Sequence, residues 1–370
     1  MAVSDDINAL VAAYQQTQPN MPGLVVGYLQ GTAPTLLEFG TTEQNGQGGA
    51  PTSTSIYEIG SVTKTFTATA LAWMVESGKI GLFDDVQPYV PSYADGGVTL
   101  PEWNPAPPAP PGPDQITFLE LADYTPGFPP DEQPGHLAGK SSWSELAAYI
   151  STGNHLVSEP GTTFAYVNDA FELLGSVVAY IQSARNTWEY ANLLAALLGS
   201  GNGFDMPDTV IGLSPDQQAR VAPGYNSYGV VTAPGGDWRI KSTLADMMVW
   251  LSYNMMLLDN CPLNSLFPYT RKPYFTLPNG RVSTSLGWFI QPISNSITRY
   301  YKNGISDGYS SFIAFDMTNP NVASQNNGVV ILNNFHASKP GRLANCILDT
   351  LAGRSCPPAN DAMSVAEAGG

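Results

Sequence analysis

The chain has 370 residues, of which 43% are hydrophobic and 12% are charged, and its formal net charge is −16. This length and hydrophobic share suffice for one large domain or two ordinary ones. The acidic balance argues against nucleic acid and anionic membranes as partners, because both need clustered Lys and Arg. No apolar run reaches the roughly 18 residues of a membrane span.

The N-terminal residues and the cysteines bear on the compartment. Residues 1–6 lack the basic and apolar regions of a signal peptide, so we expect a cytoplasmic protein or a mature secreted one with a start Met. Scarce lysine and many prolines favour a secreted or periplasmic protein. The cysteines, Cys261, Cys346 and Cys356, fit no zinc pattern. We expect buried thiols, with a disulfide between Cys346 and Cys356 as the alternative.

The first elements follow from hydrophobic periodicity. Residues 5–18 have the apolar spacing of an amphipathic helix. Residues 24–30 and 34–40 are expected to form a pair of strands, because turn residues bound both segments. Residues 61–78 predict a long helix that ends at a glycine suited to the C-terminal cap.

The middle of the chain differs from both ends. A proline-dense tract at 101–114 is expected to be a surface loop, because each proline removes a backbone donor. Segments between about 117 and 260 are mostly helical, and later segments are strand-like until a final helix at about 341–352. We therefore expect an α/β (α+β) fold with two domains. One is an α/β domain formed by both chain ends, residues 1–60 and 270–370. The other is an inserted, mostly helical domain over residues 61–269.

The first candidate for chemistry is the motif Ser61-Val62-Thr63-Lys64 at the start of the long helix. Helical residues three apart share a face, so Ser61 and Lys64 are expected within hydrogen-bonding reach. Serine needs a neighbouring base to become a nucleophile, and lysine can serve where burial or a cation lowers its pKa. Chance alone yields roughly half an instance of so short a motif, so its weight depends on other residues.

A second motif, Tyr166-Val167-Asn168, precedes the apolar helix that begins at Asp169. At this junction the Tyr166 hydroxyl is a candidate proton relay. Asn168 is a candidate for orienting Lys64 or holding a substrate amide, with an N-cap role as the structural alternative.

The third motif, Lys302-Asn303-Gly304, ends a strand-like segment. Gly304 removes a side chain that would block a substrate lying along the strand edge. Lys302 is the expected cation that lowers the pKa of Lys64 and Tyr166. The backbone N–H groups of Ser61 and Ile305 are the expected oxyanion hole, worth about 3 kcal/mol per donor.

The ordered set EIGSVTKTFTA, YVN and KNG resembles the class C β-lactamase family, which also contains penicillin-binding carboxypeptidases, D-amino-acid amidases and esterases. The segments PGLVVGYLQG, LELADYTPGFP, PGTTFAYVNDAFELLG and NNFHASKPGRL extend the resemblance over nearly the whole chain. It implies a β-lactamase/transpeptidase-like fold, an antiparallel sheet flanked by helices with an inserted helical domain.

The resemblance also implies roles for single residues. Ser61 would be the nucleophile, Lys64 and Tyr166 would share the proton transfers, and Lys302 would support them. Arg342 stands where relatives use an arginine near the substrate carboxylate. No metal or other cofactor is expected.

Two departures from the family pattern bear on the substrate. Asn303 replaces a hydroxyl residue that helps hold a β-lactam carboxylate, and GFPPDEQPG supplies no obvious equivalent of a glutamine that contacts the antibiotic side chain. The expected function is β-lactamase-like hydrolysis of an ester, amide or β-lactam through acyl-Ser61. The alternatives are a carboxylesterase, a D-amino peptidase or amidase, or a penicillin-binding homologue that acylates with little turnover. The expected partner is a small or peptide-like acyl substrate, and the sequence gives no oligomeric state.

Rival chemistries find little support. A Ser-His-Asp hydrolase would need a Gly-x-Ser-x-Gly elbow, which the chain lacks. His136, His155 and His336 are isolated and have no metal-ligand spacing. No P-loop or dinucleotide fingerprint is present.

Overall fold

The structure is a computed structural model. The residues that it describes are 3–90, 97–103, 115–130, 143–153, 156–226, 231–232, 239–318 and 326–356. Two compact units make up the chain. Unit 1 comprises Met1–Thr63, Leu198–Asn264 and Phe289–Gly370, and unit 2 comprises Lys64–Leu197 and Ser265–Trp288.

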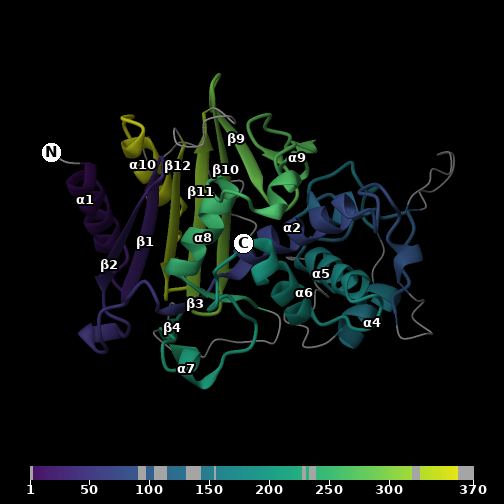
Figure 1. The fold of residues 1–370 in the computed structure, drawn as a ribbon, viewed down its shortest axis with the longest axis horizontal. Helices are drawn as coiled ribbons and strands as arrows, with labels where there is room; N and C mark the ends of the chain where they lie inside the picture. Colours follow the sequence, from purple (N-terminus) through teal and green to yellow (C-terminus); the bar gives the residue numbers. More distant parts are fainter. Residues whose placement is uncertain are drawn as a thin grey trace. The chain divides into compact units, whose positions relative to one another are not determined.

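Unit 1 is built on an antiparallel sheet with the strand order β2-β1-β12-β11-β10-β9 (Figure 1). Its strands are β1 (Gly23–Gln30), β2 (Ala33–Gly40), β9 (Phe289–Ser294), β10 (Ile297–Ser306), β11 (Tyr309–Met317) and β12 (Asn327–Asn333). β11 is buried at every residue, whereas β2 at the edge alternates between half-buried and exposed residues. The strands predicted near both chain ends are therefore confirmed.

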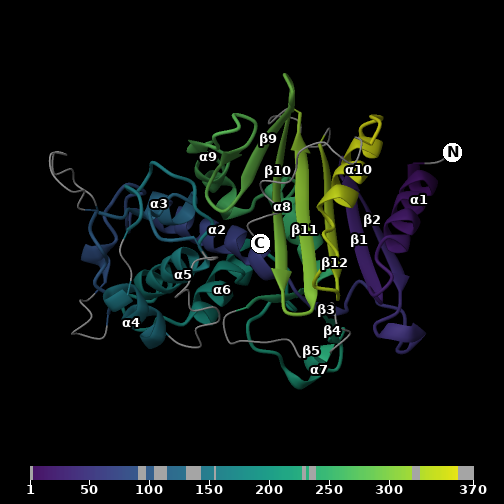
Figure 2. The same ribbon diagram turned by 180° about the vertical axis from the view of Figure 1, so that it is seen from behind.

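Helices cover both faces of this sheet, α8 on one and α1 with α10 on the other (Figures 1 and 2). Their bounds are Val3–Gln16 for α1, Leu244–Asn254 for α8 and Gly341–Leu351 for α10. Glycines let α8 approach closely, because a Cβ at Gly27 or Gly328 would lie about 2.5 Å from a methionine sulfur of this segment. The helices expected at both chain ends are also confirmed.

The helical segments of 198–264 belong to unit 1, whereas their periodicity had placed them in the inserted helical domain. The physical reason is α8, whose apolar side chains pack on β1, β11 and β12. The smaller elements of unit 1 are α7 (Pro215–Gln218), β3 (Ile56–Glu58) paired with β6 (Lys241–Thr243), and β4 (Gly224–Tyr225) paired with β5 (Val231–Thr232).

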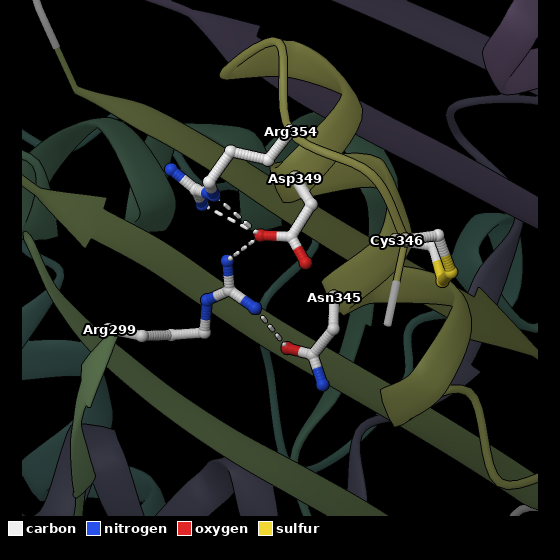
Figure 3. Close-up of a disulfide and its surroundings, with 6 residues drawn as sticks. Arg299, Asn345, Cys346, Asp349 and Arg354 are labelled. Atoms are coloured by element: carbon white, nitrogen blue, oxygen red, sulfur yellow. Dashed lines mark hydrogen bonds and ion pairs between the residues drawn. A yellow bond between two sulfur atoms is a disulfide. The ribbon is translucent and has the colours of Figure 1, made fainter. Parts of the chain in front are cut away.

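A disulfide joins Cys346 on α10 to Cys356, so the alternative pairing considered from the sequence is the one found. Cys261 is a buried free thiol. Beside the disulfide, Arg354 and the buried Arg299 share the carboxylates of Asp316 and Asp349, with N–O distances of 2.7 to 3.0 Å. Figure 3 shows both guanidinium groups converging on Asp349.

Unit 2 is mainly helical. Its elements are nearly all of α2 (Thr63–Glu76), α3 (Phe118–Ala122), α4 (Trp143–Gly153), α5 (Asn168–Gln182), α6 (Tyr190–Leu197), α9 (Phe267–Thr270) and the hairpin β7 (Phe275–Thr276) with β8 (Ser283–Thr284). Gly175 of α5 admits the Tyr190 ring, and the Tyr190 hydroxyl bonds the Thr67 hydroxyl of α2 at 2.8 Å. These contacts join α2, α5 and α6 into one core.

A three-ring aromatic stack lies at α4 and α5. The Trp188 ring stacks on Trp143 at 4.0 Å between centroids and on Tyr180 at 3.8 Å. Most of the proline tract lies outside the described residues, as do His136, His155 and residues 131–135 of GFPPDEQPG. Among the helices described, none is both long and apolar enough to span a membrane.

Candidate active site

Ser61 lies in a short 3₁₀ turn, η2 (Gly60–Val62), that leads directly into α2. The sequence had placed Ser61 on the long helix itself, and the helix instead starts at Thr63. The turn is closed by hydrogen bonds between residues three apart, from the N–H of Val62 to the carbonyl oxygen of Ile59 at 3.1 Å and from the N–H of Thr63 to that of Gly60. Ser61 is half-buried, three residues before Lys64.

The turn that carries Ser61 packs closely against β10 of the same unit. A Cβ at Gly60 would lie 2.7 Å from the backbone N of Ile305, and one at Gly304 would lie 2.1 Å from the carbonyl oxygen of Ile59. The hydroxyl of Ser311 donates to that same carbonyl at 2.7 Å. The space beside Gly304 is therefore occupied by the backbone that precedes Ser61, whereas the sequence had predicted room there for a substrate.

Lys302 is fully buried on β10. Its Nζ atom donates to the carbonyl oxygen of Asn303 at 2.9 Å and lies 3.2 Å from Oδ1 of the same residue. It also lies 5.5 Å from the centroid of the Phe289 ring. The Asn303 side chain, 7% exposed, is thus engaged with the lysine beside it.

In unit 2, Lys64, Tyr166 and Asn168 come together as the motifs predicted. The Nζ atom of Lys64 donates to Oδ1 of Asn168 at 2.5 Å and lies 4.8 Å from the centroid of the Tyr166 ring. Lys64 and Tyr166 are 6% and 9% exposed, so the ammonium group is largely removed from water.

Asn168 is the first residue of α5, and Val167 is its N-cap. The N-cap role considered for Asn168 is therefore wrong, because its side-chain oxygen accepts from Lys64. α5 forms here because its apolar residues repeat at helical spacing, and the buried ones are Ala170, Phe171, Leu173, Leu174, Val177, Val178 and Ala179.

Sequence reasoning missed two aromatic residues of this cluster. Phe171, one turn into α5, places its ring 5.4 Å from the Lys64 Nζ atom. Tyr124 stacks on Tyr166 with centroids 5.5 Å apart and ring planes 17° apart. The apolar periodicity of α5 could have identified Phe171, but no local signal in the sequence identifies Tyr124.

Next to Tyr124, the Asp123 carboxyl is buried, and this raises its pKa to about 7. Hydrogen bonds from the hydroxyl and backbone N–H of Thr125, at 2.5 and 3.2 Å, oppose the shift. Asp123 therefore changes charge near neutral pH within two residues of the aromatic cluster.

Arg342 and His336, two other residues considered from the sequence, lie in unit 1. Arg342 is exposed at the second position of α10. His336 approaches the carbonyl oxygen of Ser306 through Nδ1 at 3.3 Å. Within the described parts of the chain, no group of three or more His, Cys, Asp and Glu side chains is arranged to hold a metal ion.

Comparison with known proteins addresses the family. The Beta-lactamase family model matches residues 7–349. A β-lactamase from Lysobacter lactamgenus is 26% identical, over 95% of this chain and 92% of the relative. The D-alanyl-D-alanine-carboxypeptidase/endopeptidase AmpH of Escherichia coli is 28% identical over 62% of this chain, which spans only 56% of that protein.

Solved structures show the same fold. The D-alanine carboxypeptidase AmpC from Burkholderia cenocepacia superposes with a TM-score of 0.74 at 23% identity, covering 94% of this chain and 99% of its own. A β-lactamase/D-alanine carboxypeptidase from Pseudomonas syringae gives 0.75 at 20% identity, covering 96% and 100%. The expected β-lactamase/transpeptidase-like fold is thereby confirmed. The chain belongs to the β-lactamase family of serine acyl-hydrolases.

Proposed function

We propose that the protein opens an acyl bond by forming a covalent acyl-Ser61 intermediate, which water then hydrolyses. The observation that carries this proposal concerns Lys64, which lies three residues after Ser61. Its buried amine contacts Asn168 and the Tyr166 ring. A buried amine next to a serine is a suitable base once it is neutral.

In acylation, the Ser61 oxygen attacks the substrate carbonyl while its proton passes to Lys64 or Tyr166. The oxyanion that forms accepts hydrogen bonds from the backbone N–H groups of Ser61 and Ile305, each worth about 3 kcal/mol. Collapse breaks the bond to the leaving group, which takes the proton. Lys302 is the residue proposed to support these proton transfers as a positive charge.

In deacylation, a water molecule attacks the ester carbonyl of acyl-Ser61 and gives its proton to the same Lys64–Tyr166 pair. The proton then returns to the Ser61 oxygen as the ester bond breaks. Atoms balance over the cycle, because one water is consumed and one acid and one leaving group are released. The enzyme needs no cofactor for this sequence.

The names of the relatives point to a β-lactam or a D-alanyl peptide as the substrate, and Asn168, Asn303 and Arg342 are the residues proposed to bind it, while Gly304 lets the chain before Ser61 lie against β10. One observation favours a second candidate, an ester without a carboxylate. Asn303 has no hydroxyl to offer a carboxylate, and its side-chain oxygen is already engaged with Lys302 at 3.2 Å. We therefore propose carboxylesterase activity as the alternative.

We also propose that the protein works in an oxidising compartment, as a secreted or periplasmic protein. Support comes from the Cys346–Cys356 disulfide, because disulfides persist in such compartments and are rare in the reducing cytosol.

The test is a substrate panel of a chromogenic cephalosporin, p-nitrophenyl esters and a D-alanyl-D-alanine peptide, with turnover and intact mass measured for each. We expect steady turnover on at least one class, reduced at least about 10³-fold by Ser61→Ala. Ser77→Ala is the matched control and should leave turnover unchanged, because Ser77 is an exposed serine just after α2 whose hydroxyl donates to the Met74 carbonyl oxygen.

The outcomes separate the alternatives. A lasting mass adduct on Ser61 without turnover would identify a penicillin-binding homologue. Turnover that persists in Ser61→Ala or Lys64→Ala would refute the acyl-serine mechanism.

A further inference from the structure

Tyr124 occupies a backbone position at which glycine is usual. It follows the end of α3 with a φ of 69°, in the left-handed region. The N–H of Thr125 bonds the carbonyl of Glu120 at 3.1 Å, which is the long-range bond of the motif that ends many helices. A bulky side chain costs energy in this conformation, where glycine would not. The tyrosine side chain must therefore contribute something that glycine cannot.

The ring of Tyr124 contacts both aromatic rings that face the Lys64 amine. It stacks on Tyr166 at 5.5 Å and lies tilted against Phe171 at 5.1 Å. These two rings lie 4.8 and 5.4 Å from the Lys64 Nζ atom. Because Tyr124 is 1% exposed, its ring is fixed by packing and restricts how the Tyr166 ring can turn.

The hydroxyl of Tyr124 is also linked to Lys64, through the backbone of Gly287. It donates to the carbonyl oxygen of Gly287 at 2.9 Å. Gly287 itself lies against the first turn of α2, since a Cβ there would lie 2.6 Å from the carbonyl oxygen of Lys64. The N–H of Gly287 donates to the carbonyl oxygen of Ala122, the last residue of α3, at 2.9 Å. Tyr124 thus connects the end of α3, the Gly287 turn and the backbone of Lys64.

We propose that Tyr124 is a positioning residue that holds the plane of the Tyr166 ring beside Lys64. This inference rests on the proposed function, in which the Tyr166 hydroxyl takes part in proton transfer. A fixed ring keeps that hydroxyl at the reacting atoms. The stacking carries the effect, and the hydroxyl bond to Gly287 supports the Tyr124 ring.

The variants separate these two parts. Tyr124→Phe keeps the stack and removes only the Gly287 bond, so kcat should fall by no more than about fivefold. Tyr124→Leu keeps an apolar side chain without a ring, and we expect kcat to fall about 10- to 100-fold with KM nearly unchanged. Tyr124→Gly relieves the left-handed strain and should show the same loss of kcat as Tyr124→Leu. The basic limb of the pH–rate profile should move in both ringless variants.

Phe118→Leu is the matched control. Phe118 is a fully buried aromatic residue of α3 that packs on Tyr89 at 5.3 Å. Its substitution should lower the melting temperature while kcat and the pH–rate profile keep their wild-type values. If Tyr124→Leu behaves in the same way, Tyr124 only stabilises the fold and the inference is wrong.

A second measurement needs no substrate. With 3-fluorotyrosine incorporated at position 166, the fluorine NMR line reports the environment and motion of that ring. We expect one line in the wild type and in Phe118→Leu, and a shifted, broadened or split line in Tyr124→Leu. An unchanged line overturns the inference whatever the activity, whereas absence of acylation on the whole panel overturns the proposed function alone.

Discussion

The Nζ atom of Lys64 lies 2.5 Å from Oδ1 of Asn168, and both residues come from helix starts that are about a hundred residues apart in the sequence. The amide oxygen is an acceptor for a protonated or a neutral amine, so the pair holds Lys64 in place without fixing its charge. A carboxylate in the same position would fix it, and this difference gives the first prediction.

Asn168→Asp should suppress activity at neutral pH. A carboxylate beside the buried amine favours the charged lysine and raises its pKa, so the lysine loses its capacity as a base. We expect kcat/KM to fall about 100-fold at pH 7 and to recover in part as the pH rises. The pH–rate profile measures this. Asn279→Asp, at an exposed residue of the β7–β8 turn, adds the same charge and should change nothing. Equal profiles for both variants would contradict the prediction.

Gly304→Ala should push the turn that carries Ser61 away from β10. The new Cβ would lie 2.1 Å from the Ile59 carbonyl oxygen and 2.4 Å from the Ser311 hydroxyl, so the backbone must shift. We expect a loss of unfolding free energy of about 1 to 3 kcal/mol and slower acylation of Ser61, measured by urea denaturation and by intact mass over time. Gly212→Ala, where the added Cβ meets nothing within 4 Å, serves as the control. An acylation rate equal to that of the control would show that this contact does not position Ser61.

Asp123 should make stability depend on pH. Its pKa is raised by burial to about 7 in the folded protein, against about 3.9 in an unfolded chain. Its contribution is therefore fully favourable below about pH 4 and is lost as the pH rises to about 7. The isosteric variant Asp123→Asn does not titrate, so it should gain stability relative to the wild type over this window, by up to about 4 kcal/mol. Urea denaturation of both proteins from pH 4.5 to 8 measures the difference in their free energies of unfolding. A difference that stays constant over this range would show that Asp123 does not titrate there.

Reducing the Cys346–Cys356 disulfide should destabilise the protein by about 2 to 3 kcal/mol, because the bond restricts the unfolded chain. It also anchors the segment of Arg354, whose guanidinium contacts Asp316 and Asp349 at 2.7 Å (Figure 3). The melting temperature with and without dithiothreitol measures the effect. Cys261→Ser should keep this response to reductant, whereas the double variant Cys346→Ser/Cys356→Ser should lose it. If dithiothreitol still lowers the melting temperature of the double variant, the destabilisation does not come from this disulfide.

Much of the fold could be predicted because its signals are local. Alternating and continuous apolar residues bounded by turn residues identified β1, β2 and β12, and helical spacing identified α5 and α8. Periodicity shows that a face is buried but not which neighbour covers it. For that reason, α8 was assigned to the helical domain although it packs on the sheet of unit 1.

The candidate site was predictable where short motifs carried it. Lys64, Tyr166 and Asn168 were expected together, and they are together. Tyr124 was not foreseen, because glycine is the usual residue in the left-handed position that ends a helix, and a tyrosine there gives no sign of this conformation. The 3₁₀ turn at Ser61 was missed because the apolar spacing of residues 61–78 does not distinguish a first 3₁₀ turn from the α-helix that follows it.

The stacked rings of Trp143, Trp188 and Tyr180 give unit 2 an optical signature of its own. Two indoles at 4.0 Å couple their electronic transitions, and this coupling disappears when α4 separates from the connection between α5 and α6 that carries Trp188. Circular dichroism of the couplet therefore follows the melting of unit 2. The buried Cys261 thiol of unit 1 becomes reactive only when it is exposed, so comparing its rate of modification with the loss of the couplet would reveal whether the two units unfold together or in sequence.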